Sequence, residues 1–239
     1  MTELGRTRVE PTPIRAAIGR RMSASKREAP HFYVATEIEM DALLDATAAH
    51  NVGRDPDRRV TMTAFLVRAV ALALAEHPEF NAVWDGDTLY RVDAVNIGVA
   101  IALEDGLVAP ALLDCGARDV DDLAAGLGEL VTRARAGRLR LAEISDATFT
   151  VSNLGMFAVT AFTAIVTPPQ VSILATAATE PRAVVRDGKV VVRRMMTATM
   201  SCDHRVVDGA SAARFLETLK ARLEEPAVWA FSGPGEKSR

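Results

Sequence analysis

Apolar residues recur along the chain with two periods, and the two periods together predict an α/β fold. Segments with an apolar residue every three to four positions, or apolar on all sides, are typical of helices. Segments that alternate apolar and polar residues, or that are rich in β-branched residues, are typical of strands. The expected helices cover residues 12–29, 42–50, 63–77, 119–137 and 210–225. The expected strands cover residues 31–40, 95–103, 106–113, 147–153, 161–166, 171–177, 183–186, 189–193 and 196–202.

Particular residues mark where several of these elements begin and end. Pro30 and Pro78 each end a helix, because proline lacks the backbone N–H that a helix interior needs. Asp41 is expected to cap the helix that begins at residue 42. Helices and strands are mixed along the chain without a repeat or a linker between them. This organisation indicates one α/β domain around a large sheet.

Composition and charge narrow the classes of protein to which the chain can belong. Of its 239 residues, 49% are hydrophobic and 25% are charged, as in a globular protein, and the net charge is −3. A slightly acidic chain lacks the basic surface that nucleic acids attract. No apolar run reaches the ~18 residues of a membrane span, and the N-terminus does not resemble a secretion signal. The two cysteines, Cys115 and Cys202, give no disulfide framework and no metal-ligand spacing. We therefore expect a cytoplasmic protein with no metal, nucleic-acid or membrane partner.

The first candidate for chemistry is His204, in the stretch CDHRVVDG. It follows an apolar strand and precedes a helix, and such connections often carry catalytic groups. Histidine can both accept and return a proton near neutral pH. A base of this strength suits a thiol, whose pKa is about 8.5. These properties favour His204 as the general base in the transfer of an acyl group between two thiols.

Such a transfer also needs a hydrogen-bond donor for the oxyanion of the tetrahedral intermediate, which is typically worth ~3 kcal/mol. Ser152 ends a predicted strand and lies near Gly155, where the backbone can approach a ligand closely. Its hydroxyl is therefore our candidate donor. The competing interpretation is that this hydroxyl only satisfies backbone groups at the strand end.

HRVVDG resembles the HxxxDG signature of the catalytic domain of 2-oxo acid dehydrogenase dihydrolipoamide acyltransferases, whose fold is related to that of chloramphenicol acetyltransferase. Other segments are similar to this family in the same order along residues 11–230. They are IRAAIGRRM, HPEFNAVW, GLVAPAL, TFTVSNLGMF, AFTAIVTPPQVSILA and SCDHRVVDGA. SNLGMF with PPQ is most similar to the pyruvate-type members. The resemblance implies a mixed sheet flanked by helices, with the active site at a trimer interface.

The resemblance also implies a role for each candidate residue. His204 would deprotonate coenzyme A, and Ser152 of a neighbouring subunit would donate to the oxyanion. Asp208 matches a second polar position that orients the site, with Arg21 as its candidate partner. Gly209 would allow the last helix to begin close to the strand. Asp208 could also be only a helix N-cap, a role that is compatible with orienting the site. The competing interpretation of Arg21 is a solvated helix residue.

Other reactive side chains have simpler interpretations. Cys202 lies two residues before His204, and a thiol–imidazole pair can act in covalent catalysis. Direct transfer between two thiols needs no enzyme nucleophile, so we interpret Cys202 as an inert core residue. We expect packing or surface roles for His31, His50 and His77. No glycine-rich phosphate loop is present, so scattered Lys and Arg side chains would have to hold the phosphates of coenzyme A.

The resemblance divides the chain into a flexible tail over residues 1–11, a catalytic domain over 12–230 and a flexible tail over 231–239. Family members carry lipoyl domains ahead of the catalytic domain, but this sequence has no DKA-type lipoylation site. The lipoyl group would then come from a separate or removed segment. Family members often end in apolar residues that join trimers into cubic cages, whereas this chain ends in SGPGEKSR. We expect a homotrimer without the cage.

The expected function is transfer of an acyl group, first of all acetyl, between a dihydrolipoyl thiol and coenzyme A in a 2-oxo acid dehydrogenase complex. Branched-chain and succinyl groups remain open. A standalone enzyme that passes the acyl group to the phosphopantetheine thiol of a carrier protein is the alternative. A catalytically silent scaffold is the non-enzyme reading. The presence of His204, Ser152 and Asp208 weighs against the scaffold, because a silent site has no chemical need for all three.

Overall fold

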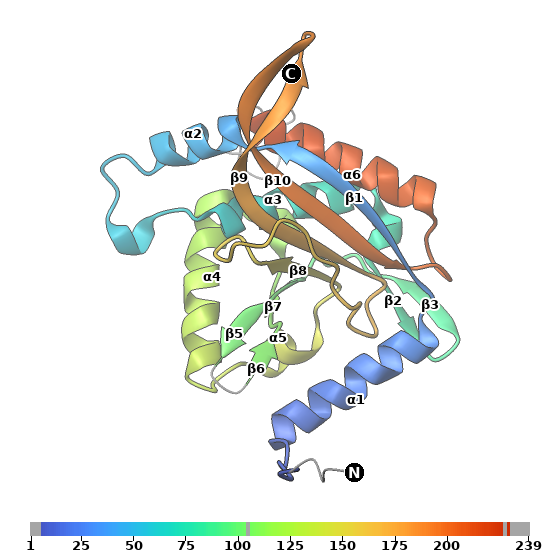
Figure 1. Cartoon of the computed structure of the whole chain (residues 1–239). Helices are drawn as coiled ribbons and strands as arrows, with labels where there is room; N and C mark the ends of the chain where they lie inside the picture. Colours follow the sequence, from blue (N-terminus) through green and yellow to red (C-terminus); the bar gives the residue numbers. More distant parts are fainter. Residues whose placement is uncertain (1–5, 104–105, 227–228, 230–239) are drawn as a thin grey trace.

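A six-stranded mixed sheet forms the centre of the protein, as the sequence predicts (Figure 1). The computed structural model describes residues 6–103, 106–226 and 229. β8 runs parallel to both of its neighbours, β4 and β9, and the other neighbouring pairs are antiparallel. In sheet order the strands are β1 (His31–Glu39), β10 (Lys189–Asp203), β9 (Ser172–Arg186), β8 (Phe149–Asn153), β4 (Ile97–Val99) and β7 (Ala111–Leu112).

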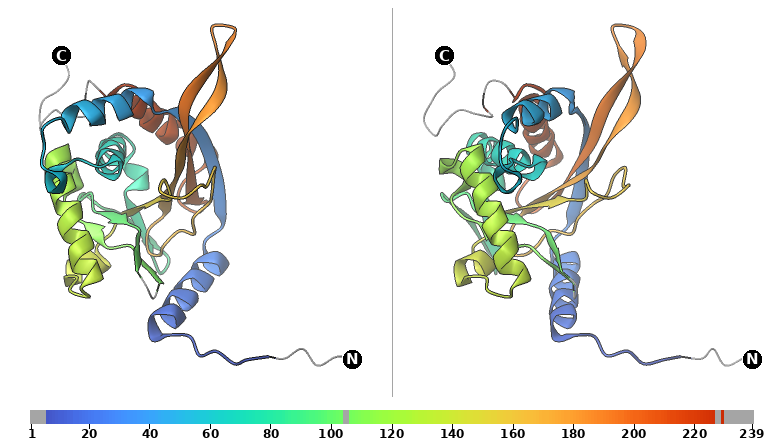
Figure 2. Two further views of the ribbon diagram at one scale, coloured as in Figure 1. Left: turned by 60° about the vertical axis from the view of Figure 1, so that its left-hand side comes forward. Right: turned by 90° about the vertical axis from the view of Figure 1, so that its left-hand side faces the viewer.

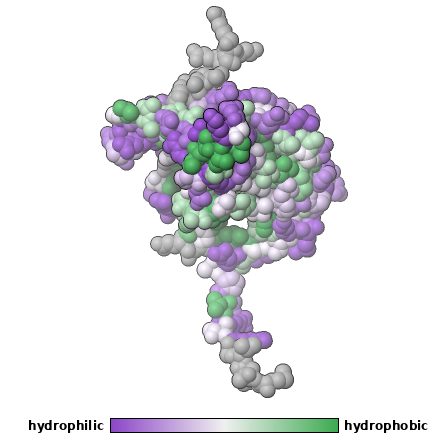
Figure 3. All heavy atoms as spheres, turned by 45° about the horizontal axis from the view of Figure 1, so that its top comes forward, coloured by the Kyte–Doolittle hydropathy of each residue, from purple (hydrophilic) through white to green (hydrophobic). Residues whose placement is uncertain are grey.

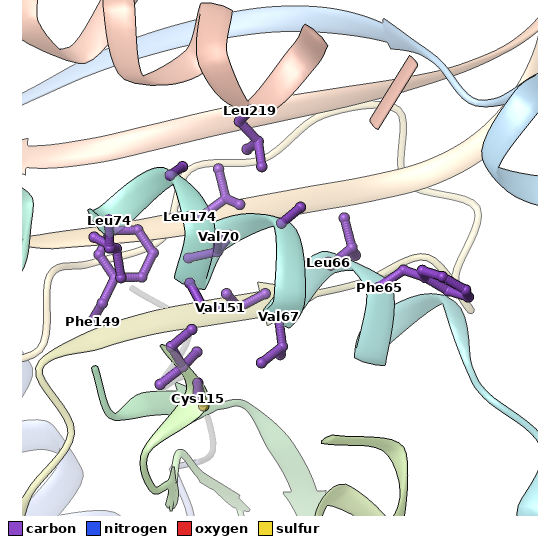
Figure 4. Close-up of a cluster of buried hydrophobic side chains, with 14 of the residues drawn as sticks. Phe65, Leu66, Val67, Val70, Leu74, Cys115, Phe149, Val151, Leu174 and Leu219 are labelled. Carbon is purple, nitrogen blue, oxygen red and sulfur yellow. The ribbon is translucent and has the colours of Figure 1, made fainter. Parts of the chain in front are cut away.

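The core lies between this sheet and the helix α3 (Met62–Glu76), which packs against α4 (Val120–Arg135) and α6 (Gly209–Glu224). α3 has apolar residues on all of its faces, and a helix of this kind is buried on all sides. Figure 4 shows its side chains against residues of the sheet and of α6. Burial of each large apolar side chain contributes about 1.5–3 kcal/mol to the free energy of folding. The labelled contacts include Leu66, Val70 and Leu74 of α3, Phe149 and Val151 of β8, Leu174 of β9 and Leu219 of α6.

The remaining elements lie around this core. Thr12 caps α1 (Pro13–Glu28) by accepting a hydrogen bond from the backbone N–H of Arg15 at 3.2 Å. Figure 2 shows α1 extending away from the helices that cover the sheet. The other helices are α2 (Asp41–His50), α5 (Leu141–Ser145) and the short 3-10 helices Pro56–Arg58, Pro78–Phe80 and Cys115–Ala117. Two small hairpins are β2 (Ala82–Asp85) with β3 (Thr88–Arg91), and β5 (Ile101–Leu103) with β6 (Gly106–Val108).

The hairpin of β9 and β10 extends beyond the rest of the sheet (Figures 1 and 2). Asp187 and Gly188 form its turn with φ values of 50° and 74°, a conformation that Asp-Gly pairs favour. The four short strands expected here form two continuous strands, β9 and β10. The bulge between Met196 and Ala198 shifts the register of β10 against β9 without ending their pairing. Apolar residues are exposed on the hairpin, and Figure 3 shows a green patch at this end of the molecule. They include Val185, Val190 and Val192.

Lys220 and Glu224 of α6 cover the edge of the sheet at β1. Lys220 donates to the backbone carbonyl of Glu37 at 2.7 Å, and Glu224 accepts from the backbone N–H of Glu39 at 2.9 Å. An uncovered edge strand is a template for pairing with other chains, so these two side chains block part of that edge.

Several expectations about single elements are wrong. Residues 161–166 form no strand, although they are rich in apolar residues, because no described strand pairs with them. Each of the strands expected over 95–103 and 106–113 is broken in two, and part of the expected turn, at 104–105, lies outside the described residues. Asp41 does not cap α2, because its carboxylate accepts from the backbone N–H and Nε of Arg194. The β2–β3 hairpin and α5 were not expected.

In the described part of the chain, no helix combines the length and the apolar character that crossing a membrane requires.

Candidate active site

His204 lies on the turn between β10 and α6, with its side chain exposed. Its backbone N–H donates to the carbonyl of Pro30 at 3.0 Å, which fixes the turn to the start of β1. Its ring lies 4.8 Å from the ring of Phe32, measured between centroids. The ring is therefore supported on one side and accessible on the other.

An ion pair between a buried carboxylate and an exposed arginine, which the sequence pattern did not predict, holds this turn. Asp203 is 2% exposed and accepts from the guanidinium of Arg205 at 2.6 and 3.0 Å and from its backbone N–H at 3.0 Å. The carbonyl of Asp203 accepts from the N–H groups of Val206 and Val207. The guanidinium of Arg205 also lies over the ring of Trp84, 4.6 Å from its centre. A charged residue directly after a buried strand was the signal in the sequence that could have identified Asp203.

Ser152 lies in the interior of the sheet, on β8, and is 9% exposed. It lines a cavity of about 600 Å³ whose wall is mostly apolar. Its hydroxyl makes no hydrogen bond to any other described residue, so the competing interpretation of a hydroxyl that satisfies backbone groups is wrong for this chain. The hydroxyl is free to donate to a ligand. Polar side chains in the same cavity are Arg21, Ser145, Thr150, Thr167 and Gln170.

Within one chain, His204 and Ser152 lie far apart. Ser152 is paired with Ala175, and Ala175 is paired with Thr199, so the serine lies two strands away from β10. His204 lies five residues beyond Thr199. At about 3.3 Å per residue and about 4.8 Å per strand, the two backbone positions are about 19 Å apart. One chain therefore cannot bring both side chains to the same reacting carbonyl.

Asp208 caps α6, a role that the sequence predicts as compatible with orienting the site. Its carboxylate accepts from the backbone N–H of Ser211 at 2.8 Å, and this bond holds the pKa of Asp208 below its ordinary value. The side chain is exposed and stays charged at neutral pH, so it does not exchange protons there. The reason given for Gly209 is wrong within this chain, because a Cβ on Gly209 would meet no atom within 4 Å.

Arg21 forms hydrogen bonds to Pro168 and not to the expected partner, Asp208. Its guanidinium donates through Nε to the carbonyl of Pro168 at 3.2 Å, and through Nη2 to the same carbonyl. Asp208 bonds to Ser211 instead, so the structure does not bring Arg21 and Asp208 together within one chain. Arg21 lies in the wall of the cavity that contains Ser152. It thus belongs to the serine's surroundings and not to those of the histidine.

Both cysteines are buried, and for Cys202 this agrees with its interpretation as an inert core residue. Burial raises the pKa of the Cys115 thiol to about 11 and that of the Cys202 thiol to about 12. Both thiols are protonated at neutral pH and are poor nucleophiles. Among the described residues, no group of three or more His, Cys, Asp or Glu side chains could hold a metal ion.

The other three histidines make structural contacts. His31 bonds through Nδ1 to the carbonyl of Ala29 at 2.8 Å, and its Nε2 accepts from the backbone N–H of Val166 at 3.1 Å. His50 lies 3.0 Å from a carboxylate oxygen of Asp121. His77 lies 2.9 Å from the hydroxyl of Thr218. Each ring joins two elements that are distant in the sequence.

Comparison with known proteins places the chain among acyltransferases. The family model described as 2-oxoacid dehydrogenases acyltransferase (catalytic domain) matches residues 3–231. The acetyltransferase component of the pyruvate dehydrogenase complex of Rickettsia bellii is 38% identical over 217 residues. These residues are 90% of this chain and 52% of that protein, so the chain spans about half the length of the curated relatives it matches.

Solved structures share the fold. A probable dihydrolipoamide acetyltransferase from Listeria monocytogenes superimposes with a TM-score of 0.88 at 31% identity, covering 98% of this chain and 99% of the other. The dihydrolipoamide acetyltransferase of Azotobacter vinelandii, studied for the roles of a serine, a histidine and an asparagine in its catalytic mechanism, also reaches 0.88. It is 32% identical, and 93% of each chain is covered. A chloramphenicol acetyltransferase reaches 0.57 at 17% identity over 85% of this chain and 94% of its own, which supports the expected fold.

Proposed function

The chain belongs to the family of 2-oxoacid dehydrogenase acyltransferases, as a catalytic domain, and from this premise we propose that it transfers an acyl group between a dihydrolipoyl thiol and coenzyme A. Acetyl is the proposed acyl group, because the relatives named above are acetyltransferases. The Rickettsia relative is a component of a pyruvate dehydrogenase complex, and we propose the same kind of complex as the partner of this chain.

The observation that carries the proposal is the placement of His204 and Ser152. Each is accessible on its own side, His204 on a rigid turn and Ser152 in an apolar cavity, yet one chain holds them about 19 Å apart. A complete site forms when the His204 of one subunit meets the Ser152 of another. We propose a homotrimer, in which a closed ring of three chains repeats this contact three times.

The proposed reaction uses both side chains on one thioester. His204 takes the proton of the coenzyme A thiol, and the thiolate attacks the carbonyl carbon of the acyl-dihydrolipoyl thioester. The carbonyl becomes an oxyanion that accepts a hydrogen bond from the Ser152 hydroxyl. When the intermediate collapses, the carbon–sulfur bond to the dihydrolipoyl group breaks, and that sulfur takes the proton from His204. Cys202 takes no part, because burial keeps its thiol protonated.

The spacing of the three polar residues supports their roles. In the Azotobacter acetyltransferase, the serine, histidine and asparagine studied for catalysis have the same separations along the chain as Ser152, His204 and Asp208 here. The third residue is an asparagine there and an aspartate here. Both have a side-chain oxygen that can cap a helix, so the difference is compatible with an orienting role for Asp208.

The direct test is a panel of acyl-dihydrolipoamides with free coenzyme A as the acceptor. We expect acetyl transfer in the wild type, and a loss of about a hundredfold or more in His204→Ala, because a general base contributes that much. Ser152→Ala is expected to lose a similar factor in kcat. Cys202→Ser, which alters the neighbouring thiol, is the matched control and should keep most of the rate.

Two results would contradict the proposal. An unchanged rate in His204→Ala would remove the imidazole from the reaction. Transfer to a carrier-protein phosphopantetheine thiol, but not to free coenzyme A, would favour the standalone enzyme over the proposed function.

A further inference from the structure

Gln170 shares the cavity of Ser152, although the function proposed above does not use it. It directly follows Pro169 and precedes β9, and it is 6% exposed. The hydroxyl of Thr150 donates to its Oε1 at 2.6 Å. A buried amide carbonyl is thereby satisfied, and the plane of the amide is fixed.

The NH₂ group of the Gln170 amide has no hydrogen-bond partner among the described residues. Nε2 of Gln170 donates to no other described residue, and it is not among the polar atoms that are sealed from solvent. Gln170 and Ser152 both line the cavity, so an unpaired N–H of this amide is available to a ligand that the cavity holds. An amide held in this way is a hydrogen-bond donor ready for a ligand.

The sheet places this amide beside Ser152. Thr150 and Ser152 are two residues apart on β8, so their side chains lie on the same face, about 7 Å apart. Gly98, the residue paired with Thr150 on β4, leaves room for the Thr150 side chain. A Cβ on Gly98 would lie 2.8 Å from the Thr150 hydroxyl oxygen, so any larger residue there would displace it.

Three side chains from α1 and β1 hold the segment that leads to Gln170. Arg21 donates to the carbonyl of Pro168. Ser25 donates to the carbonyl of Val166 at 2.6 Å, and His31 accepts from the N–H of Val166 at 3.1 Å. These contacts fix the backbone of a segment that belongs to no strand. The Gln170 amide is therefore held from both sides, by this segment and by Thr150.

We propose that the side-chain amide of Gln170 is a second hydrogen-bond donor to the carbonyl oxygen of the acyl thioester, with Thr150 as its positioning residue. An oxyanion can accept more than one hydrogen bond, and Ser152 supplies only one. The cavity wall is mostly apolar, so a donor directed into it acts more strongly than in water. This inference rests on the proposed function and names a further residue for the same reaction.

The kinetic test replaces the donor and its anchor separately. Gln170→Ala should lower kcat about tenfold or more, and Gln170→Glu should lower it further, because a carboxylate has no N–H and repels the oxyanion. Thr150→Val should lower kcat less than Gln170→Ala does. Thr150→Ser keeps the hydroxyl, so its kcat should fall less than that of Thr150→Val. Thr148→Val removes a hydroxyl that bonds to the backbone of Asn96 outside the cavity wall, and is the matched control. A rate in Gln170→Glu equal to that of the wild type would overturn the inference.

A spectroscopic test needs no turnover. Acetyl-dihydrolipoamide labelled with ¹³C at its carbonyl is bound to the assembled protein without coenzyme A, and the carbonyl stretch is recorded by infrared difference spectroscopy. A donated hydrogen bond lowers this frequency, so Gln170→Ala should raise it relative to wild type, and Thr148→Val should not. An identical frequency in Gln170→Ala and wild type overturns the inference while the proposed function stands. A wild type that binds the thioester but transfers nothing to coenzyme A contradicts the proposed function instead.

Discussion

His204 is exposed, whereas the carboxylate of its neighbour Asp203 is buried. Asp203 is sealed beneath the turn and is neutralised by Arg205, which also stacks on Trp84. A buried carboxylate without a partner would be costly, so loss of the Arg205 guanidinium should destabilise this arrangement of the turn. The imidazole itself keeps both nitrogens available for a substrate, because no described group bonds to its ring.

Substitutions of Asp208 can separate the effect of its helix cap from the effect of its negative charge. Asp208→Ala should lower the thermal stability, because the N–H of Ser211 loses its acceptor. Asp208→Asn keeps a side-chain oxygen there and should keep both the stability and most of the acyl-transfer rate. Thermal denaturation and the rate are measured on the same samples. A folded Asp208→Asn protein with little activity would mean that the site uses the negative charge itself.

At the scale of elements, α5 is held to α4 by one buried ion pair. Glu143 of α5, with a side chain 5% exposed, accepts from Arg133 of α4 at 2.7 Å and from the backbone N–H of Arg140 at 2.8 Å. Burial alone would raise the pKa of Glu143, but these hydrogen bonds outweigh it, and the pKa lies below the ordinary value of 4.5. This pair fixes α5, whose Ile144 and Ser145 form part of the cavity wall.

The lowered pKa of Glu143 sets the pH range in which the pair stabilises the fold. A carboxyl group with a lowered pKa in the folded state contributes its full stability above its unfolded value, and loses it as the pH falls through the folded value. Glu143→Gln should therefore cost about 1–3 kcal/mol at pH 7, and the difference from wild type should shrink below about pH 4. Urea denaturation from pH 7 to pH 3 measures this.

The control for Glu143 is Glu129→Gln, which removes the other carboxylate that pairs with Arg133. The Glu129 side chain is 70% exposed, so its loss should change the stability little at any pH. Equal effects of the two substitutions would show that burial of Glu143 is not the cause.

At the scale of the whole molecule, the order of the strands in the sheet keeps Ser152 and His204 apart. β9 lies between β8, which carries Ser152, and β10, which leads to His204. The sheet is paired along its length on both sides of β9, so no local movement closes the distance. The proposed reaction therefore requires several copies of the chain to associate.

Mixed oligomers test this directly. A His204→Ala chain retains an intact Ser152, and a Ser152→Ala chain retains an intact His204. If each site combines residues of two chains, co-assembly of the two inactive variants in equal amounts should restore about a quarter of the sites. The acyl-transfer rate and the subunit number are measured on the same sample, with each variant carried alone through the same treatment. Persistent inactivity of a well-assembled mixture would contradict the shared site.

The sequence by itself determined most of the elements and the candidate chemistry. The apolar all-round pattern of residues 63–77 and the proline after it predict α3, because burial and the lack of a backbone N–H are local properties. Residue type and position at an element end indicate His204 and Ser152, and the family resemblance adds Asp208. The family resemblance gave them roles, and the comparisons support the family while the roles remain proposals.

Only the tertiary structure decided which residues meet. Residues 161–166 have the composition of a strand, but a strand needs a partner, and their backbone is held by the side chains of Ser25 and His31 instead. The sequence predicts Asp208 as the partner of Arg21, but Arg21 bonds to Pro168, and no sequence pattern indicates the contact of Thr150 with Gln170. The contacts of Arg21, Ser25 and His31 join residues more than a hundred positions apart, and that of Thr150 with Gln170 joins residues 20 positions apart. Periodicity cannot predict them, because it describes only how each segment presents its own faces.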